Sequence, residues 1–194
     1  MNSKNTLSLG KKLKVLLVET DREKAHVLEC ALQKARYDVV KVNNFGMSLL
    51  RQVELAQPDI IIIDMESPDR DMLESLNRIS DSAPKPVVMF SQNDDQSTIN
   101  QLVKSGVSAY VIGGIDNARV KSIIDIAIAR FAEYQSLKEE LKLTKQKLSS
   151  QKSVEKAKLW LMQSRNLSES EAYHFIRKTA MDNSQKVEDV AKNL

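Results

Sequence analysis

Short apolar runs alternate with amphipathic stretches over the first part of the chain. The runs are rich in β-branched residues, and several are apolar at every position, which is typical of parallel strands covered on both faces. They predict strands at Val15–Val18, Val39–Val40, Ile60–Ile63, Val87–Phe90 and Ala109–Ile112. Stretches with a helical period lie between them, at Arg22–Arg36, Phe45–Ala56, Asp71–Ile79 and Thr98–Lys104. This alternation predicts an α/β doubly wound domain with a five-stranded parallel sheet.

The pattern changes after Gly114, because the 80 residues from Ile115 to Leu194 contain neither glycine nor proline. Their absence predicts a mostly helical tail that begins with one long helix. Apolar residues recur along that helix every seven positions, at Val120, Ala127, Tyr134, Leu141 and Leu148, with Ile124, Phe131 and Leu137 between them. We expect the early part to pack on the sheet and the later part to form a parallel coiled coil in a homodimer. A lone amphipathic linker helix is the alternative.

The last segment carries three apolar stripes and one clear helix start. The stripes are Val154, Ala157, Leu161 and Met162; then Ala172, Phe175, Ile176, Thr179 and Ala180; then Val187, Val190, Ala191 and Leu194. Ser168 and Glu171 have the spacing of a capping box, which predicts a helix over Glu169–Asp182. We therefore divide the chain into an α/β domain at 12–130, a coiled coil at 131–152 and a small three-helix bundle at 153–194.

Composition and charge narrow the function. The chain is 42% apolar and 28% charged, which supports a packed core. The apolar run Ile60–Ile63 is far too short to span a bilayer, and Met1–Lys14 lacks a secretory signal, so we expect a cytoplasmic protein with no membrane partner. One cysteine and two histidines rule out an internal disulfide and disfavour a thiolate or imidazole metal site. The net charge of +3 lies entirely in residues 132–194, which hold 12 Lys and Arg against 9 Asp and Glu.

The residues that follow the predicted strands are the candidate site of the α/β domain. Glu19 and Asp21 follow the first strand, Asp64 the third and Ser91 the fourth. The carboxyl ends of parallel strands meet at one edge of the sheet, so these carboxylates repel unless Mg²⁺ or a proton lies among them. Glu19 and Asp64 are the candidate magnesium ligands, with Asp21 as a weaker one.

This arrangement resembles the receiver domain of bacterial response regulators. The resemblance implies that Glu19 belongs to the Mg²⁺-holding acidic pair, that Asp64 accepts a phosphoryl group, and that the Ser91 hydroxyl binds phosphoryl oxygens. Thr20 stands where the second acid is expected, and Gly113 stands where a phosphate-binding lysine is expected. Two interpretations therefore stay open. Asp64 is either a phosphoacceptor or a strand-end carboxylate of a pseudo-receiver that requires no cofactor and switches by protein contact.

The loop after the third predicted strand also differs from an ordinary receiver. Pro68 fixes a turn, and Asp69 or Asp71 can cap the helix that follows by accepting backbone N–H bonds. The alternative is a partner-binding loop beside Asp64.

The tail resembles the ANTAR domain, the RNA-binding module of bacterial transcription antiterminators, from about residue 134 onward. The matching motifs are Ala157-Lys158, Leu161-Met162, Glu171-Ala172-Tyr173, Arg177 and Ala180-Met181. The resemblance implies RNA binding, although Leu159 replaces a usual glycine and Gln151 lies near a usual arginine. Cations neutralise RNA phosphates, and aromatic rings stack on looped bases. The candidate RNA-binding residues are Lys156, Lys158, Arg165, Tyr173, Arg177, Lys178 and Lys186, and charge and family position agree best at Lys158, Arg177 and Lys178.

A receiver, a coiled coil and an ANTAR domain in this order resemble the AmiR–NasR–NasT group of antiterminators, above all its nitrate-responsive members. That resemblance implies a two-hairpin leader RNA as ligand, control of nitrate and nitrite assimilation genes, and restraint by a NasS-like nitrate sensor protein. Two other functions stay open: a phosphorylation-dependent DNA-binding response regulator and a protein-interaction adaptor. We expect no enzymatic activity.

Overall fold

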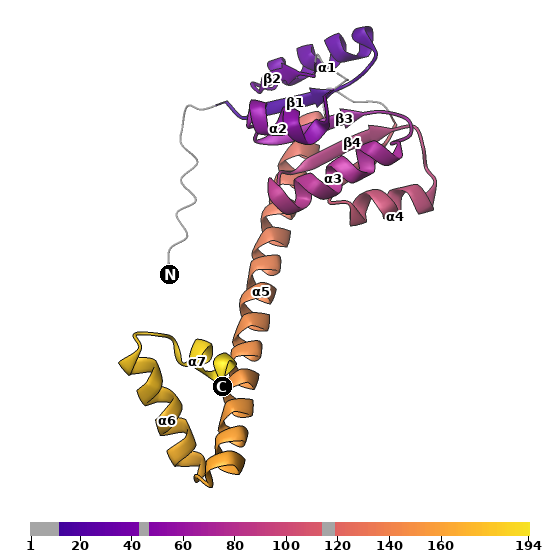
Figure 1. The fold of residues 1–194 in the computed structure, drawn as a ribbon. Helices are drawn as coiled ribbons and strands as arrows, with labels where there is room; N and C mark the ends of the chain where they lie inside the picture. The colour runs from indigo at the N-terminus through magenta and orange to yellow at the C-terminus, as the bar shows by residue number, and fades with distance from the viewer. Residues whose placement is uncertain (1–11, 43–46, 114–118) are drawn as a thin grey trace. The chain divides into compact units, whose positions relative to one another are not determined.

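The structure is a computed structural model that describes residues 12–42, 47–113 and 119–194 (Figure 1). The chain divides into two compact units, one through Glu133 and one from Tyr134 onward. In the described residues, no helix is long and apolar enough to cross a membrane.

The first unit is built on the predicted parallel sheet. Its strands are β1 Lys14–Val18, β2 Asp38–Lys41, β3 Ile60–Asp64, β4 Val87–Ser91 and β5 Ala109–Ile112, in the order β2-β1-β3-β4-β5. All four neighbouring pairs are parallel. The predicted doubly wound fold is confirmed, and β1 and β3 lie side by side in the middle of the sheet.

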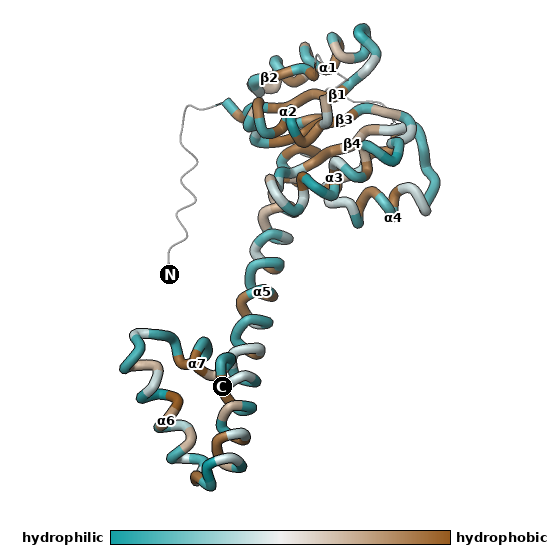
Figure 2. Tube along the Cα trace, viewed as in Figure 1, coloured by the Kyte–Doolittle hydropathy of each residue, from teal (hydrophilic) through white to brown (hydrophobic). Residues whose placement is uncertain are grey.

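Helices cover both faces of this sheet. They are α1 Arg22–Lys34, α2 Leu49–Ala56, α3 Arg70–Ser82, α4 Gln96–Lys104 and the first turns of α5, which runs from Val120 to Arg165. Alternate side chains of a strand point to opposite faces. One face packs on residues of α2, α3 and α4, and the other on residues of α1 and α5. Figure 2 shows the hydrophobic positions gathered in the central strands.

Side-chain caps set where the helices begin. The Asp69 carboxylate accepts a bond from the Met72 backbone N–H at 2.7 Å, which confirms the predicted cap of α3 and assigns it to Asp69. Phe45, predicted to start the second helix, lies outside the described residues, and α2 begins at Leu49 after a cap by Ser48.

The second unit is a three-helix bundle, as predicted. The end of α5 packs with α6 Glu169–Asp182 and α7 Val187–Asn193 around a core that includes Leu161 and Ile176. The predicted capping box of α6 is present, with Ser168 and Glu171 bonded reciprocally. Leu194 is 39% exposed and lies outside the core, so its assignment to the third stripe was wrong. That difference arises because α7 ends at Asn193.

The apolar stripe of α5 divides as expected. Val120, Ile124 and Ala127 are buried in the core of the first unit. Further along, Tyr134, Leu137, Leu141 and Leu148 are each more than half exposed. Large apolar side chains in one exposed row are typical of a helix that buries this row against a partner.

Candidate functional site

Two acidic side chains meet at the carboxyl edge of the sheet. Glu19 follows β1 and Asp64 ends β3, and the two strands pair in register through Val18 and Ile63. The pKa of Asp64 is raised from 3.8 to about 6, chiefly by burial and then by the charge of Glu19 and a hydrogen bond to it. The two carboxyls therefore share a proton in mildly acidic solution.

Asp21 takes no part in this pair. Its Oδ1 accepts bonds from the backbone N–H groups of Glu23 and Lys24 at 2.8 and 3.2 Å, so it caps α1. The Asp21 backbone N–H in turn donates to Oε1 of Glu19 at 2.8 Å. One oxygen of Asp21 is therefore held at the helix start, so a metal ligated by Asp21, as the sequence predicts, would have to bind its other oxygen.

The Ser91 hydroxyl is also engaged. Ser91 is 3% exposed, donates to the carbonyl oxygen of Glu66 at 2.9 Å, and accepts from the backbone N–H of Asn93 at 3.1 Å. The Tyr110 hydroxyl donates to the carbonyl oxygen of Asn93 at 2.6 Å. These bonds tie the loops after β3 and β4 to each other and to strand β5, and a phosphoryl group would have to compete with them for Ser91.

The cation at this edge comes from a residue that the sequence analysis did not select. Gly113 has a φ of +100°, a conformation that residues with side chains rarely adopt. Because glycine has no side chain, no charged group occupies the position where a receiver domain is expected to have a lysine. The positive charge of Lys24 lowers the pKa of Asp64. Lys24 lies in the first turn of α1, close after the Asp21 cap, and this position was the signal that could have identified it.

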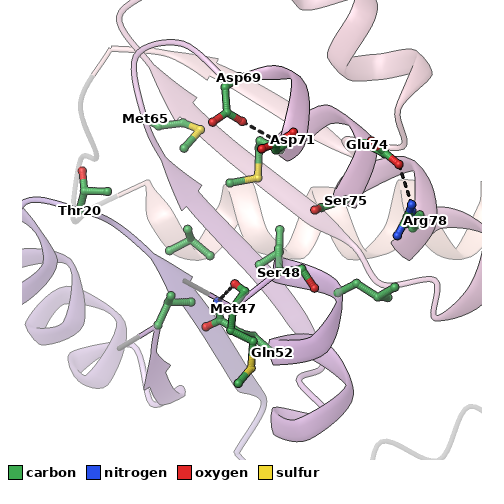
Figure 3. A pocket seen from close by; sticks show the side chains of 15 residues that line it. Thr20, Met47, Ser48, Gln52, Met65, Asp69, Asp71, Glu74, Ser75 and Arg78 are labelled. Atoms are coloured by element: carbon green, nitrogen blue, oxygen red, sulfur yellow. Dashed lines mark hydrogen bonds and ion pairs between the residues drawn. The ribbon is translucent and has the colours of Figure 1, made fainter. Parts of the chain in front are cut away.

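A cleft of about 570 Å³ lies beside this edge, between α2 and α3 (Figure 3). Its wall includes three methionines, Met47, Met65 and Met72, and Thr20 lies at its border. On the α3 side, Glu74 and Arg78 form an ion pair at 2.6 Å. The cleft is therefore mainly apolar, with charged groups along one side.

In the second unit, Lys158 differs from the other predicted RNA-binding residues. It is 8% exposed, and its Nζ lies 2.9 Å from Glu155 and 2.6 Å from Glu169. These bonds raise the pKa of Lys158 and connect α5 to α6. Its ammonium charge is neutralised within the bundle, so it is unavailable for RNA phosphates in this structure.

Exposed cations gather on α6 and at the end of α5. His174, Arg177 and Lys178 are exposed on one side of α6. Arg165 stacks on the Phe175 ring, with 4.7 Å between the guanidinium carbon and the ring centre. Phe175, His174 and Lys178 also line a shallow hollow. We call the exposed arginines and lysine of this region, Arg165, Arg177 and Lys178, the α6 cationic face.

The remaining candidates lie elsewhere. Tyr173 and Lys186 line a groove formed by α5, α6 and α7. Lys156 is exposed, and it precedes buried Ala157 on α5, about 100° around the helix from it. The structure thus places Tyr173 and Lys186 in one groove, Arg165 at the end of α5 over Phe175, and Arg177 and Lys178 on the exposed side of α6, and it leaves Lys156 apart from these.

Comparison with known proteins identifies both units. The family model of the response regulator receiver domain matches residues 15–125, and the model of the ANTAR domain matches residues 143–194. The chain therefore belongs to the response regulator receiver family. More closely, it is an ANTAR-containing response regulator of two-component signalling, and neither matching family is enzymatic.

Similar proteins match either most of the chain or its receiver unit. The transcriptional regulatory protein PdtaR of Mycobacterium tuberculosis is 25% identical over 179 residues, which cover 92% of this chain and 87% of PdtaR. The transcriptional regulatory protein KdpE of Staphylococcus aureus is 28% identical over 98 residues, covering 50% of this chain and 42% of KdpE. The receiver domain of a modulated diguanylate cyclase from Desulfovibrio desulfuricans shares the fold, with a TM-score of 0.55 at 22% identity over 64% of this chain and 99% of that one.

Receiver domains commonly bind Mg²⁺, which requires near-octahedral oxygen ligands. Here Glu19 and Asp64 are directed at each other, Thr20 replaces an acid, and Asp21 caps a helix. Among the described residues, no three acidic, histidine or cysteine side chains are grouped as metal ligands. The donor set therefore does not fit a magnesium ion without rearrangement.

Proposed function

We propose that this ANTAR response regulator binds RNA through its second unit and acts as a transcription antiterminator. The observation that carries the proposal is the α6 cationic face: Arg177 and Lys178 are exposed on α6, and Arg165 stacks on Phe175 of the same helix. Exposed cations neutralise the phosphates of a folded RNA, so RNA binding should weaken as the salt concentration rises. The ANTAR match over residues 143–194 supports the same class of ligand.

We propose a two-hairpin leader RNA as the ligand of a homodimer. The exposed apolar row Tyr134, Leu137, Leu141 and Leu148 supports a coiled coil between two copies, because pairing removes this row from water. Each copy then offers one cationic face, so that one dimer engages two hairpins. The target genes in this proposal are those of nitrate and nitrite assimilation, and a NasS-like nitrate sensor restrains the dimer.

The receiver unit supports control by a protein partner. Asp64 has no lysine at Gly113 to bind a phosphoryl dianion, and Ser91 is already hydrogen-bonded. A contact between a lysine and a phosphoryl group usually contributes a few kcal/mol when it is partly buried. We therefore treat the unit as a pseudo-receiver whose state depends on what binds its surface.

The second candidate is a phosphorylation-dependent DNA-binding regulator. A recognition helix in the major groove reads bases with several Arg, Asn or Gln side chains near its start. The first turns of α6 contain Ser, Glu, Ala, Tyr and His, and its arginine lies in the third turn. This sequence favours RNA over DNA. A protein-interaction adaptor, the third candidate, needs no cationic face at all.

Mobility-shift titration of the full chain separates these functions. The probes are a double-hairpin leader RNA and a DNA duplex of equal length, each at two salt concentrations. The proposal expects tighter binding of the RNA, while the DNA-binding candidate expects the reverse and the adaptor binds neither. Asp64→Ala should change RNA affinity less than threefold, whereas a tenfold loss would restore control by phosphorylation.

A further inference from the structure

The groove of the second unit has the chemistry of a nucleobase site. It has a volume of about 820 Å³ and lies where α5 passes α6 and α7. Side chains from all three helices and from the turn before α7 line it, among them Leu143, Gln146, Lys147, Gln151, Tyr173 and Lys186.

Its lining combines an aromatic ring with an apolar wall. Tyr173 is 46% exposed and Leu143 is 49% exposed, and partly buried Val154 and Val187 add further apolar surface. The amides of Gln146 and Gln151 supply both donors and acceptors. A flat group with polar edges therefore finds a stacking surface and hydrogen-bonding partners in the same place.

The charges of the groove balance each other. Lys147, Lys186 and Lys192 face Glu155, Glu188 and Asp189 in the lining. Two of the carboxylates already have cations, since Glu155 pairs with Lys158 and Asp189 with Lys192. A groove whose positive and negative charges are equal in number binds a phosphate dianion poorly and suits a neutral ligand. In the described chain, however, Lys147 and Lys186 form no ion pair, which leaves them able to contact phosphates beside such a ligand.

Part of the groove lies away from the seam of the proposed dimer. Its α5 residues Leu143 and Ser150 each lie two positions after a residue of the apolar row, Leu141 and Leu148. Two residues correspond to about 200° around a helix of 3.6 residues per turn, so Leu143 and Ser150 are on the opposite face of α5 from the seam. Gln151 lies fourteen residues after Leu137 and is therefore on the side of the seam.

We propose that this groove binds an unpaired nucleobase of the RNA loop, with the base stacked on Tyr173 and its edge bonded to Gln146 or Gln151. Lys147 and Lys186 then contact the phosphates on either side of that nucleotide. Single-stranded loops are recognised in this way, by unstacked bases on aromatic rings. The proposal rests on the proposed RNA binding. It adds that the groove selects the loop sequence while the α6 cationic face supplies affinity that is independent of sequence.

The test uses the full chain and a pool of RNA stem–loops with randomised loops. Wild type should enrich particular loops, and the best of these should bind Tyr173→Ala about tenfold or more weakly, the usual effect of removing one base–aromatic stack. Tyr173→Phe keeps the ring and should stay within threefold of wild type. Trp160→Ala is the matched control, because Trp160 is 47% exposed and lies outside the groove lining.

Abasic loop nucleotides identify the bound base. Replacing one particular nucleotide should weaken wild type about tenfold. The same replacement should weaken Tyr173→Ala less than twofold, because the stack is already lost. Gln151→Ala should change which base is preferred at that position, and circular dichroism checks that each variant is folded.

The outcomes separate the two proposals. If wild type retains no stem–loop even at low salt, the proposed function fails and this inference fails with it. If wild type binds RNA but Tyr173→Ala and the abasic substitution act independently, RNA binding stands and the nucleobase site is refuted. Equal loop preferences in wild type and Tyr173→Ala would refute it as well.

Discussion

Replacing Asp64 by asparagine should stabilise the receiver unit at neutral pH. The pKa of Asp64 is raised from 3.8 to about 6, so the folded state holds this proton more tightly than the unfolded chain does. Stability therefore falls as pH rises from about 4 to about 6, and the full penalty is present above that range. Asparagine is neutral at every pH and can still donate a hydrogen bond to Glu19, so it should remove the penalty.

The size of the effect follows from the shift in pKa. Moving the pKa of Asp64 from 3.8 to about 6 corresponds to about 3 kcal/mol between the protonated and ionised states. Asp64 retains partial exposure at the edge of the sheet, and solvent screens its repulsion from Glu19. We therefore expect Asp64→Asn to gain about 1–2 kcal/mol at pH 7.5 and much less at pH 4.

Urea unfolding at several pH values from 4 to 7.5 measures this gain, with hydrogen exchange of β3 amides used to follow the receiver unit itself. Asp38→Asn is the control, because Asp38 is an exposed carboxylate of the edge strand β2. The difference between Asp64→Asn and wild type should grow with pH and then level off. A gain that is absent at pH 7.5, or equal at all pH values, would refute the raised pKa that burial and the neighbouring Glu19 give Asp64.

Three further predictions concern the second unit. Lys158→Met should lower the melting temperature of the bundle, since it leaves Glu155 and Glu169 without their shared cation. The fluorescence of the chain's single tryptophan reports the unfolding of this unit. Lys156→Met is the control, because Lys156 is exposed and its replacement should have little effect on the melting temperature. Arg177→Ala should weaken RNA binding severalfold and reduce its salt dependence while light scattering still reports a dimer; an unchanged salt slope would contradict this role. Replacing Leu141 and Leu148 together by aspartate should yield monomers by analytical ultracentrifugation, and a persistent dimer would place the interface elsewhere.

The strands and helices were predictable because their apolar residues repeat with clear periods. Ile60–Ile63 is apolar at each position and forms the central strand β3, buried on both faces. The capping box of Ser168 and Glu171 predicted the start of α6 at Glu169, where the structure has it. The turns after α5 and α6 contain no glycine. Asn166 and Ser184 adopt the left-handed conformation there instead, each with a φ of 52°.

The environments of individual polar side chains were less predictable. The charge of Lys158 predicted that this residue binds RNA. However, Lys158 lies four positions after Val154 and three before Leu161, on the stripe of α5 that faces the core. Its burial could have been inferred from that spacing, but its pairing with Glu169 depends on how α6 packs against α5. Likewise, the bond from Ser91 to the Glu66 carbonyl depends on a loop conformation that no residue period encodes.

The hydrogen bonds at the carboxyl edge of the receiver sheet affect which kind of signal can change the conformation of this unit. A phosphoryl group on Asp64 that recruits the Ser91 hydroxyl must first break its bond to the Glu66 carbonyl, and a partly buried hydrogen bond of this kind contributes about 0.5–1.5 kcal/mol. Gly113 offers no cation to recover that energy, and Lys24 is an exposed side chain whose charge is screened by water. An input shifts a two-state equilibrium only by the difference between its affinities for the two states. We therefore propose that the input is a protein surface that contacts the loops after β3 and β4, because such a surface can replace the broken bond with bonds of its own.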